Sequence, residues 1–438
     1  MNALIFLKNK INLFGLTMLF LFSGIFFVEF YLRKIFNDNG IPPLNIKIVS
    51  FLTIVFSGLL FLYLKLKKYL KTNDISKKVF TSAIYLFIAF QVFLVLIPPT
   101  GSADVYNYIF TTKVLTHYQA NPYLVPEGFF NNDPLINLTF TRAHNVGLIY
   151  GPLWLLIYIT PSLLSSLVNN IWLSVVFFKL VAIIFNIGSA YLIYKILEII
   201  QKKYKYIGTI LYMFNPFLLY EIANNGHNDI LMVFFILLSF FFWLKNKYYL
   251  GLIFLILSSL IKIVAIILLP IFVLIAINKK KLLKNKATFI INSVLIFLLI
   301  YYLAFLFSGG NPTIIAGILD QGKVFNFLSL SPLPLVLKLL KMNPGTIKLI
   351  SSLVFFILYF IILLKIILGK EKNKIIENYL NVFIIYFLTG STMFMPWYFI
   401  WAIPLSILIN QQKINIALTT LGFASYTILT LFIVHFYL

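Results

Sequence analysis

Long apolar runs, separated by short polar turns, make up most of this chain. A helix needs about 20 apolar residues to cross the hydrocarbon of a bilayer. Runs near that length are expected to span at residues 11–32, 46–64, 79–98, 171–197, 206–222, 228–244, 249–261, 264–278, 287–307, 346–368, 375–393, 398–411 and 414–437. The pattern therefore predicts an all-α polytopic membrane helix bundle with about 13 transmembrane helices.

The apolar pattern is interrupted between Pro98 and Trp154. This segment opens with Asp104 in the string GSADVYNY, continues through QANPY and Arg142, and closes with YGPLW. The apolar run 149–168 contains two prolines, so we expect a helix lying along the outer membrane surface and not a crossing. A chain that only fills a bilayer has no need of such a segment, which indicates chemistry at the membrane surface.

Composition supports a membrane protein. Of the 438 residues, 61% are hydrophobic and 11% are charged, with a mean hydropathy of +0.98, whereas about a quarter of a soluble domain is charged. The net charge of +23 comes from lysines between apolar spans, which the positive-inside rule explains without nucleic acid. Lysine groups at 65–71 and 279–286 are expected to contact anionic membrane lipids. Cysteine is absent, which excludes disulfides, thiolate metal sites and a cysteine nucleophile.

The lysine-rich loops also predict the orientation of the chain. Basic loops at 65–78, 198–205, 279–286 and 370–374 are expected in the cytoplasm. An even number of crossings must then separate Lys247 from Lys279, which favours two short helices that turn near Lys262. The amino terminus is predicted inside and the carboxyl terminus outside. Every unusual polar string then falls on the outer face: segment 98–170, NNGHND, the Lys262 turn, loop 308–345 and MPWY.

This topology divides the chain into five segments. We expect three amino-terminal transmembrane helices, an external catalytic loop with surface-lying helices, a central transmembrane bundle, a second external loop and a group of carboxyl-terminal transmembrane helices. Their boundaries are 1–98, 99–170, 171–307, 308–345 and 346–438.

Asp104 is the leading candidate for a catalytic residue. It follows Pro98, Pro99 and Gly101 and precedes a helical pattern. A carboxylate at the membrane surface can act as a general base, because partial burial tunes its pKa. The alternative is helix capping, in which Ser102 or Asp104 satisfies the free N–H groups of the first turn.

The string NNGHND contains five polar residues in succession before a span. His227 is a candidate contact for a donor phosphate or a sugar hydroxyl, with Asp229 orienting it and Asn225 binding substrate. The alternative is again a cap, with Asn225 at the N-cap and Asp229 in the first turn. The pair of His227 and Asp229 lacks a third nearby ligand of the kind that zinc uses, so no metal is indicated and no cofactor is expected.

Two cations are candidate phosphate ligands. Lys262 interrupts the apolar stretch LSSLIKIVAII, and an ionisable group inside membrane sequence suggests function. Arg142 is the only arginine in the predicted outer loops, and its planar fork suits a phosphate. The alternatives are a snorkelling lysine at a helix turn and a plain surface charge.

Aromatic residues recur at the predicted outer boundary. Most simply they form an interfacial belt, but Trp397 and Tyr398 flank no ordinary turn and are candidates for stacking on sugar rings. Tyr108, Asn121 and Tyr150 complete the candidate substrate-binding residues.

Taken in order, these strings resemble those of the polytopic GT-C-fold glycosyltransferases. The resemblance rests on DVYNY with Asp104, NPY from Asn121, YGPLW, NP from Asn215 with NNGHND, SSLIK, and PWYFIWAIPL from Pro396. It spans roughly residues 98–410 and is closest to the bacterial polyprenyl-phosphate-mannose-dependent mannosyltransferases. These have an N-in, C-out bundle with an acidic residue in the first large external loop. Here one acid stands where some branches carry a pair, which weakens a metal-dependent interpretation.

The resemblance implies transfer of a sugar, mannose or another hexose or pentose, from a polyprenyl-phosphate donor to a glycan, lipid or protein hydroxyl. Asp104 would be the base of an inverting reaction on the extracytoplasmic face of the plasma membrane. Two other classes compete. A transporter or lipid flippase would have two related halves and central ionisable groups, and a non-enzymatic assembly factor would need no clusters of His with Asp.

Overall fold

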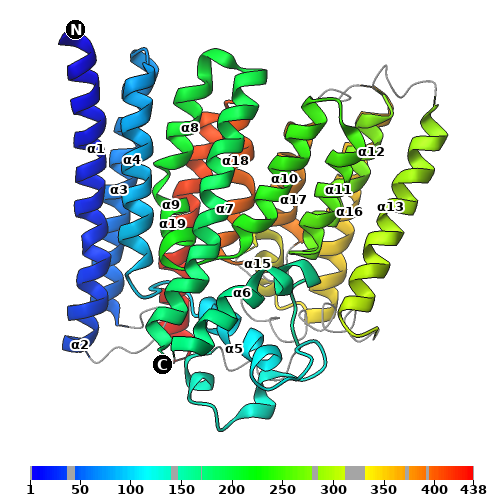
Figure 1. Cartoon of the computed structure of the whole chain (residues 1–438), viewed down its shortest axis with the longest axis horizontal. Coiled ribbons are helices and arrows are strands. Elements are labelled where there is room, and N and C mark those ends of the chain that lie inside the picture. The colour runs from blue at the N-terminus through cyan, green and yellow to red at the C-terminus, as the bar shows by residue number, and fades with distance from the viewer. Residues whose placement is uncertain are drawn as a thin grey trace. The chain divides into compact units, whose positions relative to one another are not determined.

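The computed structural model describes residues 2–36, 45–139, 147–168, 170–278, 285–310, 331–369, 374–390 and 394–437, with side chains described from residue 10 to residue 428 of these ranges. Within them the chain forms helices joined by turns and has no strand (Figure 1), which confirms the all-α prediction. The chain divides into two compact units. Unit 1 comprises Met1–Ile109, Leu164–Ile230 and Ser406–Leu438, and unit 2 comprises Phe110–Leu163 and Leu231–Leu405.

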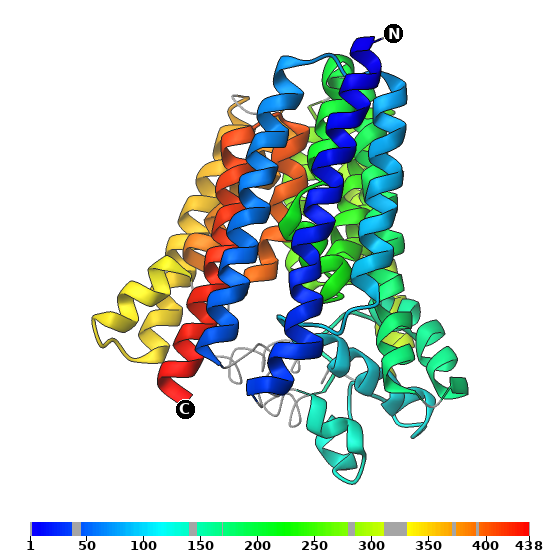
Figure 2. The same ribbon diagram turned by 90° about the vertical axis from the view of Figure 1, so that its left-hand side faces the viewer.

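Unit 1 is a bundle of long helices with one broken helix inside it. Its elements are α1 (Asn2–Phe27), η1 (Val28–Leu32), α2 (Arg33–Phe36), α3 (Ile46–Thr72), α4 (Lys77–Val95), the start of α5 (Asp104–Thr116), the end of α6 (Pro152–Val168), α7 (Ile171–Ile200), η5 (Lys202–Tyr204), α8 (Lys205–Met213), α9 (Pro216–Leu219), η6 (Tyr220–Asn224), the first residues of α10 (Asp229–Leu244), the end of α18 (Phe399–Leu408) and α19 (Gln412–Tyr437). Helix α1 packs against both α3 and α4 (Figure 2).

Unit 2 contains the remainder of α5, α6, α10 and α18 together with shorter elements. These are η2 (Glu127–Phe130), η3 (Pro134–Leu138), α11 (Tyr248–Ser259), η7 (Ile263–Leu268), α12 (Leu269–Ala276), α13 (Lys286–Phe307), α15 (Pro332–Leu339), α16 (Pro344–Ile367), α17 (Ile375–Ile385), η9 (Tyr386–Gly390) and η10 (Pro396–Tyr398).

Among the described residues, six helices are long and apolar enough to cross a membrane: Lys10–Ile35, Ile46–Thr72, Lys77–Val95, Ile171–Ile200, Lys286–Phe307 and Pro344–Ile367. A seventh span results if Pro216–Asn224 and Asp229–Leu244 are taken as one broken helix, which is bent by 119° at the break. Five further apolar helices have 10–17 residues. The polytopic membrane fold is confirmed, and the count of 13 crossings and their sidedness stay predictions.

The structure corrects the predicted span 206–222 and confirms the predicted break within 249–278. The run 206–222 is not one helix, because it breaks at Asn215 before Pro216, whose ring cannot continue the hydrogen-bond ladder. The Asn215 side chain instead caps the next turn, accepting from the N–H groups of Phe217 and Leu218 at 3.1 Å. The stretch 249–278, by contrast, does form two short helices that break around Lys262, as predicted.

The two ends of unit 1 differ in chemistry. The amino end of α1, the α3–α4 turn and the α7–α8 turn lie at one end, while the start of α5 and the carboxyl end of α19 lie at the other (Figures 1 and 2). The first end carries lysine-rich sequence, including Lys65–Lys71 and Lys202–Lys205. Within unit 1, the basic turns and the candidate catalytic loop are therefore at opposite ends.

A buried lysine ties α7 to the end of α4. Lys179 has no exposed surface, and its ammonium donates to the carbonyl oxygens of Leu94 at 2.9 Å, Val95 at 3.0 Å and Ile97 at 2.6 Å. The last carbonyls of a helix lack partners within the helix, and a cation there also suits the helix dipole. The three bonds fix the direction in which the chain leaves α4 toward Asp104.

We expect Lys179→Met to destabilise the protein by on the order of 3 kcal/mol, because it leaves three buried carbonyls without their charged donor. Thermal unfolding of the purified protein in detergent measures this as a lower Tm. Lys195→Met is the matched control, since Lys195 lies on the same helix in a surface ion pair with Glu198 and such pairs contribute little. Equal Tm values for the two variants would contradict the assigned role of Lys179.

Candidate functional site

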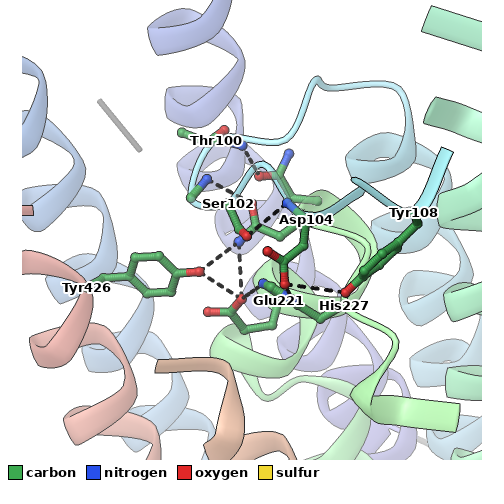
Figure 3. Close-up of polar contacts among 10 residues, drawn as sticks. Thr100, Ser102, Asp104, Tyr108, Glu221, His227 and Tyr426 are labelled. Carbon is green, nitrogen blue, oxygen red and sulfur yellow. Dashed lines mark hydrogen bonds and ion pairs between the residues drawn. The ribbon is translucent and has the colours of Figure 1, made fainter. Parts of the chain in front are cut away.

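The loop between α4 and α5 is held by Asn224 and Asn225, the first two residues of NNGHND. The Asn224 side chain accepts from the Thr100 N–H at 3.3 Å and donates to the Pro98 carbonyl at 3.0 Å. The Asn225 side chain accepts from the Gly101 N–H at 2.9 Å (Figure 3). Because these amides satisfy backbone groups that are buried from water, the loop keeps one conformation. Asn225 therefore supports the loop and is not the N-cap of α10 that the capping alternative requires.

Asp104 is the first residue of α5, and its backbone and side chain have different partners. The Asp104 N–H donates to the Ser102 hydroxyl at 3.2 Å, while the Asp104 carboxylate accepts from the Tyr108 hydroxyl at 3.4 Å (Figure 3). The Asp104 side chain is 26% exposed, whereas Tyr108 is buried. The carboxylate thus remains open to a reactant on one side.

His227 lies between two carboxylates. Its Nδ1 is 3.6 Å from Asp104 Oδ2, and its Nε2 is 3.2 Å from Glu221 Oε2. The preceding Gly226 has a φ of +74°, a conformation that glycine adopts without the strain of a Cβ. This turn brings the imidazole back over η6, where it is completely buried.

Glu221 is the residue that sequence reasoning missed. It is fully buried in η6, and its Oε2 accepts from Asn225 Nδ2 at 3.2 Å and from the Tyr426 hydroxyl at 3.0 Å. Glu221 falls inside the predicted span 206–222, so it was not considered as a site residue. The available signal was an acidic residue inside membrane sequence, since such a group is costly to bury and suggests function.

Asp229 is fully buried at the first position of α10, within electrostatic range of Glu221. Of the residues that the structure describes, no group of three or more His, Cys, Asp or Glu side chains is arranged to hold a metal ion.

In unit 2, Lys262 lies against two tyrosine rings. Its Nζ is 5.4 Å from the ring centre of Tyr150 and 5.8 Å from that of Tyr398. The Tyr398 ring in turn stacks on Trp401, with ring centres 4.4 Å apart. Cations over aromatic faces are attracted by the ring quadrupole. The structure therefore brings three of the predicted site residues of unit 2 together, namely Lys262, Tyr150 and Tyr398.

The other predicted residues of unit 2 are placed differently. The Asn121 side chain accepts from the Tyr123 N–H at 3.0 Å and donates to the Ser308 carbonyl at 2.9 Å, so it stabilises a turn. Trp397 is buried beside Tyr398. Arg142 lies outside the described residues.

A further buried acid, Glu127, lies in unit 2. Glu127 accepts from the Thr111 hydroxyl at 2.6 Å, and burial raises the pKa of Glu127 to about 7. A carboxyl group with this pKa exchanges its proton near neutral pH, so it is a second titrating group to consider in pH experiments.

One comparison with known families is informative. A family model described as "Alpha-(1->6)-mannopyranosyltransferase, N-terminal domain" matches residues 35–278, which is more than half of the chain. The match includes Asp104, Glu221, His227 and Lys262. A comparison with curated proteins finds no match.

Gly101 offers a direct test of how closely the loop is enclosed. A Cβ there would lie 2.6 Å from the Tyr220 hydroxyl and 2.9 Å from Asn225 Nδ2. We expect Gly101→Ala to cost about 1–3 kcal/mol, as overfilled interiors do, and to lower the Tm. In Gly345→Ala, the control, the nearest neighbouring atom is 3.4 Å away, so its Tm should be unchanged. A wild-type Tm for Gly101→Ala would show that the loop is looser than described.

Proposed function

Because this chain belongs to the alpha-(1->6)-mannopyranosyltransferase family and is a membrane glycosyltransferase, we propose that it transfers mannose or a related sugar from a polyprenyl-phosphate donor to a glycan hydroxyl. The reaction takes place on the extracytoplasmic face of the plasma membrane and inverts the anomeric centre. Asp104 is the general base.

The chemistry of this proposal is a single displacement. The acceptor oxygen attacks C1 of the sugar as its proton passes to Asp104, and the bond from C1 to the phosphate oxygen breaks on the opposite side. Polyprenyl phosphate leaves with the electron pair. A correctly positioned base accelerates such a proton transfer by about 10²–10⁴-fold.

One observation carries the proposal. Asp104, His227 and Glu221 form a polar cluster in unit 1. Among these three, Asp104 retains exposed surface, at 26% of its side chain, while Glu221 and His227 have none. The cluster therefore offers one carboxylate to a reactant, and the buried residues hold it in place. This arrangement fits a base, which must combine an exposed carboxylate with fixed neighbours.

Lys262 is the proposed partner of the donor phosphate. The tyrosine rings of Tyr150 and Tyr398 hold its ammonium, and a fixed cation stabilises the charge that develops on a departing phosphate. Trp397 and Tyr398 remain proposals for contacts with sugar rings, as do Tyr108, Asn121, Asn225 and Asp229 for other substrate contacts and Arg142 for the phosphate. A lipid-phosphate donor keeps its polyprenyl tail in the bilayer, which accounts for a site on a membrane protein.

Replacing Asp104 tests the base. With radiolabelled polyprenyl-phosphate mannose and an alkyl mannoside that carries a free 6-hydroxyl, Asp104→Asn should lower kcat about 10²–10⁴-fold while Tm is retained. Asp74→Asn makes the same chemical change in the exposed α3–α4 turn and should transfer label normally. Undiminished transfer by Asp104→Asn would remove Asp104 from the mechanism.

Replacing Lys262 tests the phosphate contact. Lys262→Met should raise the KM for the labelled donor about 10–100-fold, since a hydrogen bond to a charged group contributes about 1.5–3 kcal/mol. Lys245 also lies over an aromatic ring, 5.7 Å from the centre of Phe241, but is exposed, so Lys245→Met is the control. An unchanged KM in both variants would contradict the assignment.

A further inference from the structure

Three ionisable side chains from two distant segments of the sequence form a row. Glu221, His227 and Asp104 follow one another with contacts of 3.2 Å and 3.6 Å (Figure 3). The inner two have no exposed surface, and only Asp104 reaches the outside. The buried imidazole thus contacts the candidate base on one side and a second carboxylate on the other.

Folding alone gives little reason for this row. Burying charged groups is costly even when they are paired, and apolar side chains of similar size often give equal or greater stability. Glu221 is further held by Asn225 and Tyr426, so the protein uses two more polar groups to keep the acid in one position. Buried ionisable groups that are arranged so closely behind an exposed carboxylate are typical of proton-handling sites.

The geometry points to a proton path in which Asp104 passes the proton of the acceptor to Nδ1 of His227, while Glu221, 3.2 Å from Nε2, is the positioning residue. This inference rests on the proposed function. It gives His227 a role through Asp104 in place of the phosphate contact predicted from sequence, since two neighbouring carboxylates disfavour an anion.

The steps balance in atoms and charge. The acceptor O–H bond breaks and an O–H bond to Asp104 forms, while the sugar moves from phosphate to the acceptor oxygen. The proton then moves from Asp104 Oδ2 to His227 Nδ1, which makes imidazolium and restores the carboxylate. The proton returns through Asp104, the exposed member of the row, to water after the product leaves, which resets the site. The 3.6 Å separation of the two atoms is of the kind that shortens when reactants bind.

Other groups around the row define its charge. Tyr108 faces Asp104 from α5, Tyr426 and Tyr220 face Glu221 from α19 and η6, and Asp229 acts on Glu221 from α10. The nearby cations are engaged elsewhere: Lys179 donates to carbonyls at the end of α4, and Arg33 pairs with Glu29 at 2.8 Å. Glu221 is therefore the acidic group in contact with Nε2.

The test is the pH dependence of kcat/KM for transfer from radiolabelled polyprenyl-phosphate mannose. Activity needs the Asp104–His227 pair unprotonated, so it falls as the pH drops through the pKa of that pair. A neighbouring negative charge raises this pKa. Glu221→Gln removes the acid that can balance an imidazolium at His227 and should move the midpoint of the acidic limb down by about 1–3 pH units, with a lower kcat.

Tyr426→Phe should move the midpoint in the same direction by a smaller amount. It removes a hydroxyl that donates to Glu221 and stabilises the ionised acid, so Glu221 is less able to balance an imidazolium at His227. Because Tyr426→Phe removes only one oxygen atom, it is expected to fold. It therefore provides the test if Glu221→Gln does not fold. A purely structural role of either residue would lower Tm and activity at every pH and leave the midpoint in place.

Two controls complete the experiment. Glu198→Gln makes the same chemical change in a surface ion pair at the basic end of unit 1 and should leave the profile unchanged. Glu127→Gln tests whether the buried acid Glu127 sets the midpoint instead. A midpoint that shifts in this variant alone would overturn the inference. Wild-type transfer with unmoved midpoints in Glu221→Gln and Tyr426→Phe would also overturn it, while leaving the proposed function standing. Wild-type protein that transfers no label would overturn both.

Discussion

The hydrogen bonds that Lys179 makes to the end of α4 are the constraint on which the candidate site depends. A chain that leaves a helix beside a membrane must find partners for its free carbonyls, because lipid offers none. Lys179 supplies three N–H bonds to Leu94, Val95 and Ile97. With those carbonyls fixed, the prolines that follow turn the chain in one direction, and Asp104 begins α5 at a defined place.

The second half of the constraint comes from NNGHND. Asn224 and Asn225 bind the backbone of the same loop from the other side, and Asn225 also bonds to Glu221. Loop support and carboxylate positioning are therefore one hydrogen-bond network. Shared hydrogen bonds of this kind restrict the groups that they join to one arrangement, which is what a base needs if it is to meet an acceptor hydroxyl in a fixed orientation.

Sequence patterns predicted the elements better than their contacts. The long apolar runs gave the helices, and Lys262 marked the break within 249–278 because a charge interrupts a span visibly. The break at Asn215 was missed, since the apolar pattern continues on both sides of it. Glu221 and Lys179 were missed for a related reason: each is a single charge inside a run that was predicted to span the membrane, and hydropathy averages conceal one charge among many apolar neighbours.

By itself the sequence determined an all-α membrane protein, the separation of its basic turns from its polar strings, and Asp104 as the residue to examine first. These three features follow from the composition of individual segments, which does not depend on how the segments pack together. Only the tertiary structure decided that His227 lies between Asp104 and Glu221, that Tyr426 donates to the same acid, and that Lys179 supports the loop. Such pairings join residues up to 205 positions apart, and they arise from helix packing, which no local pattern records.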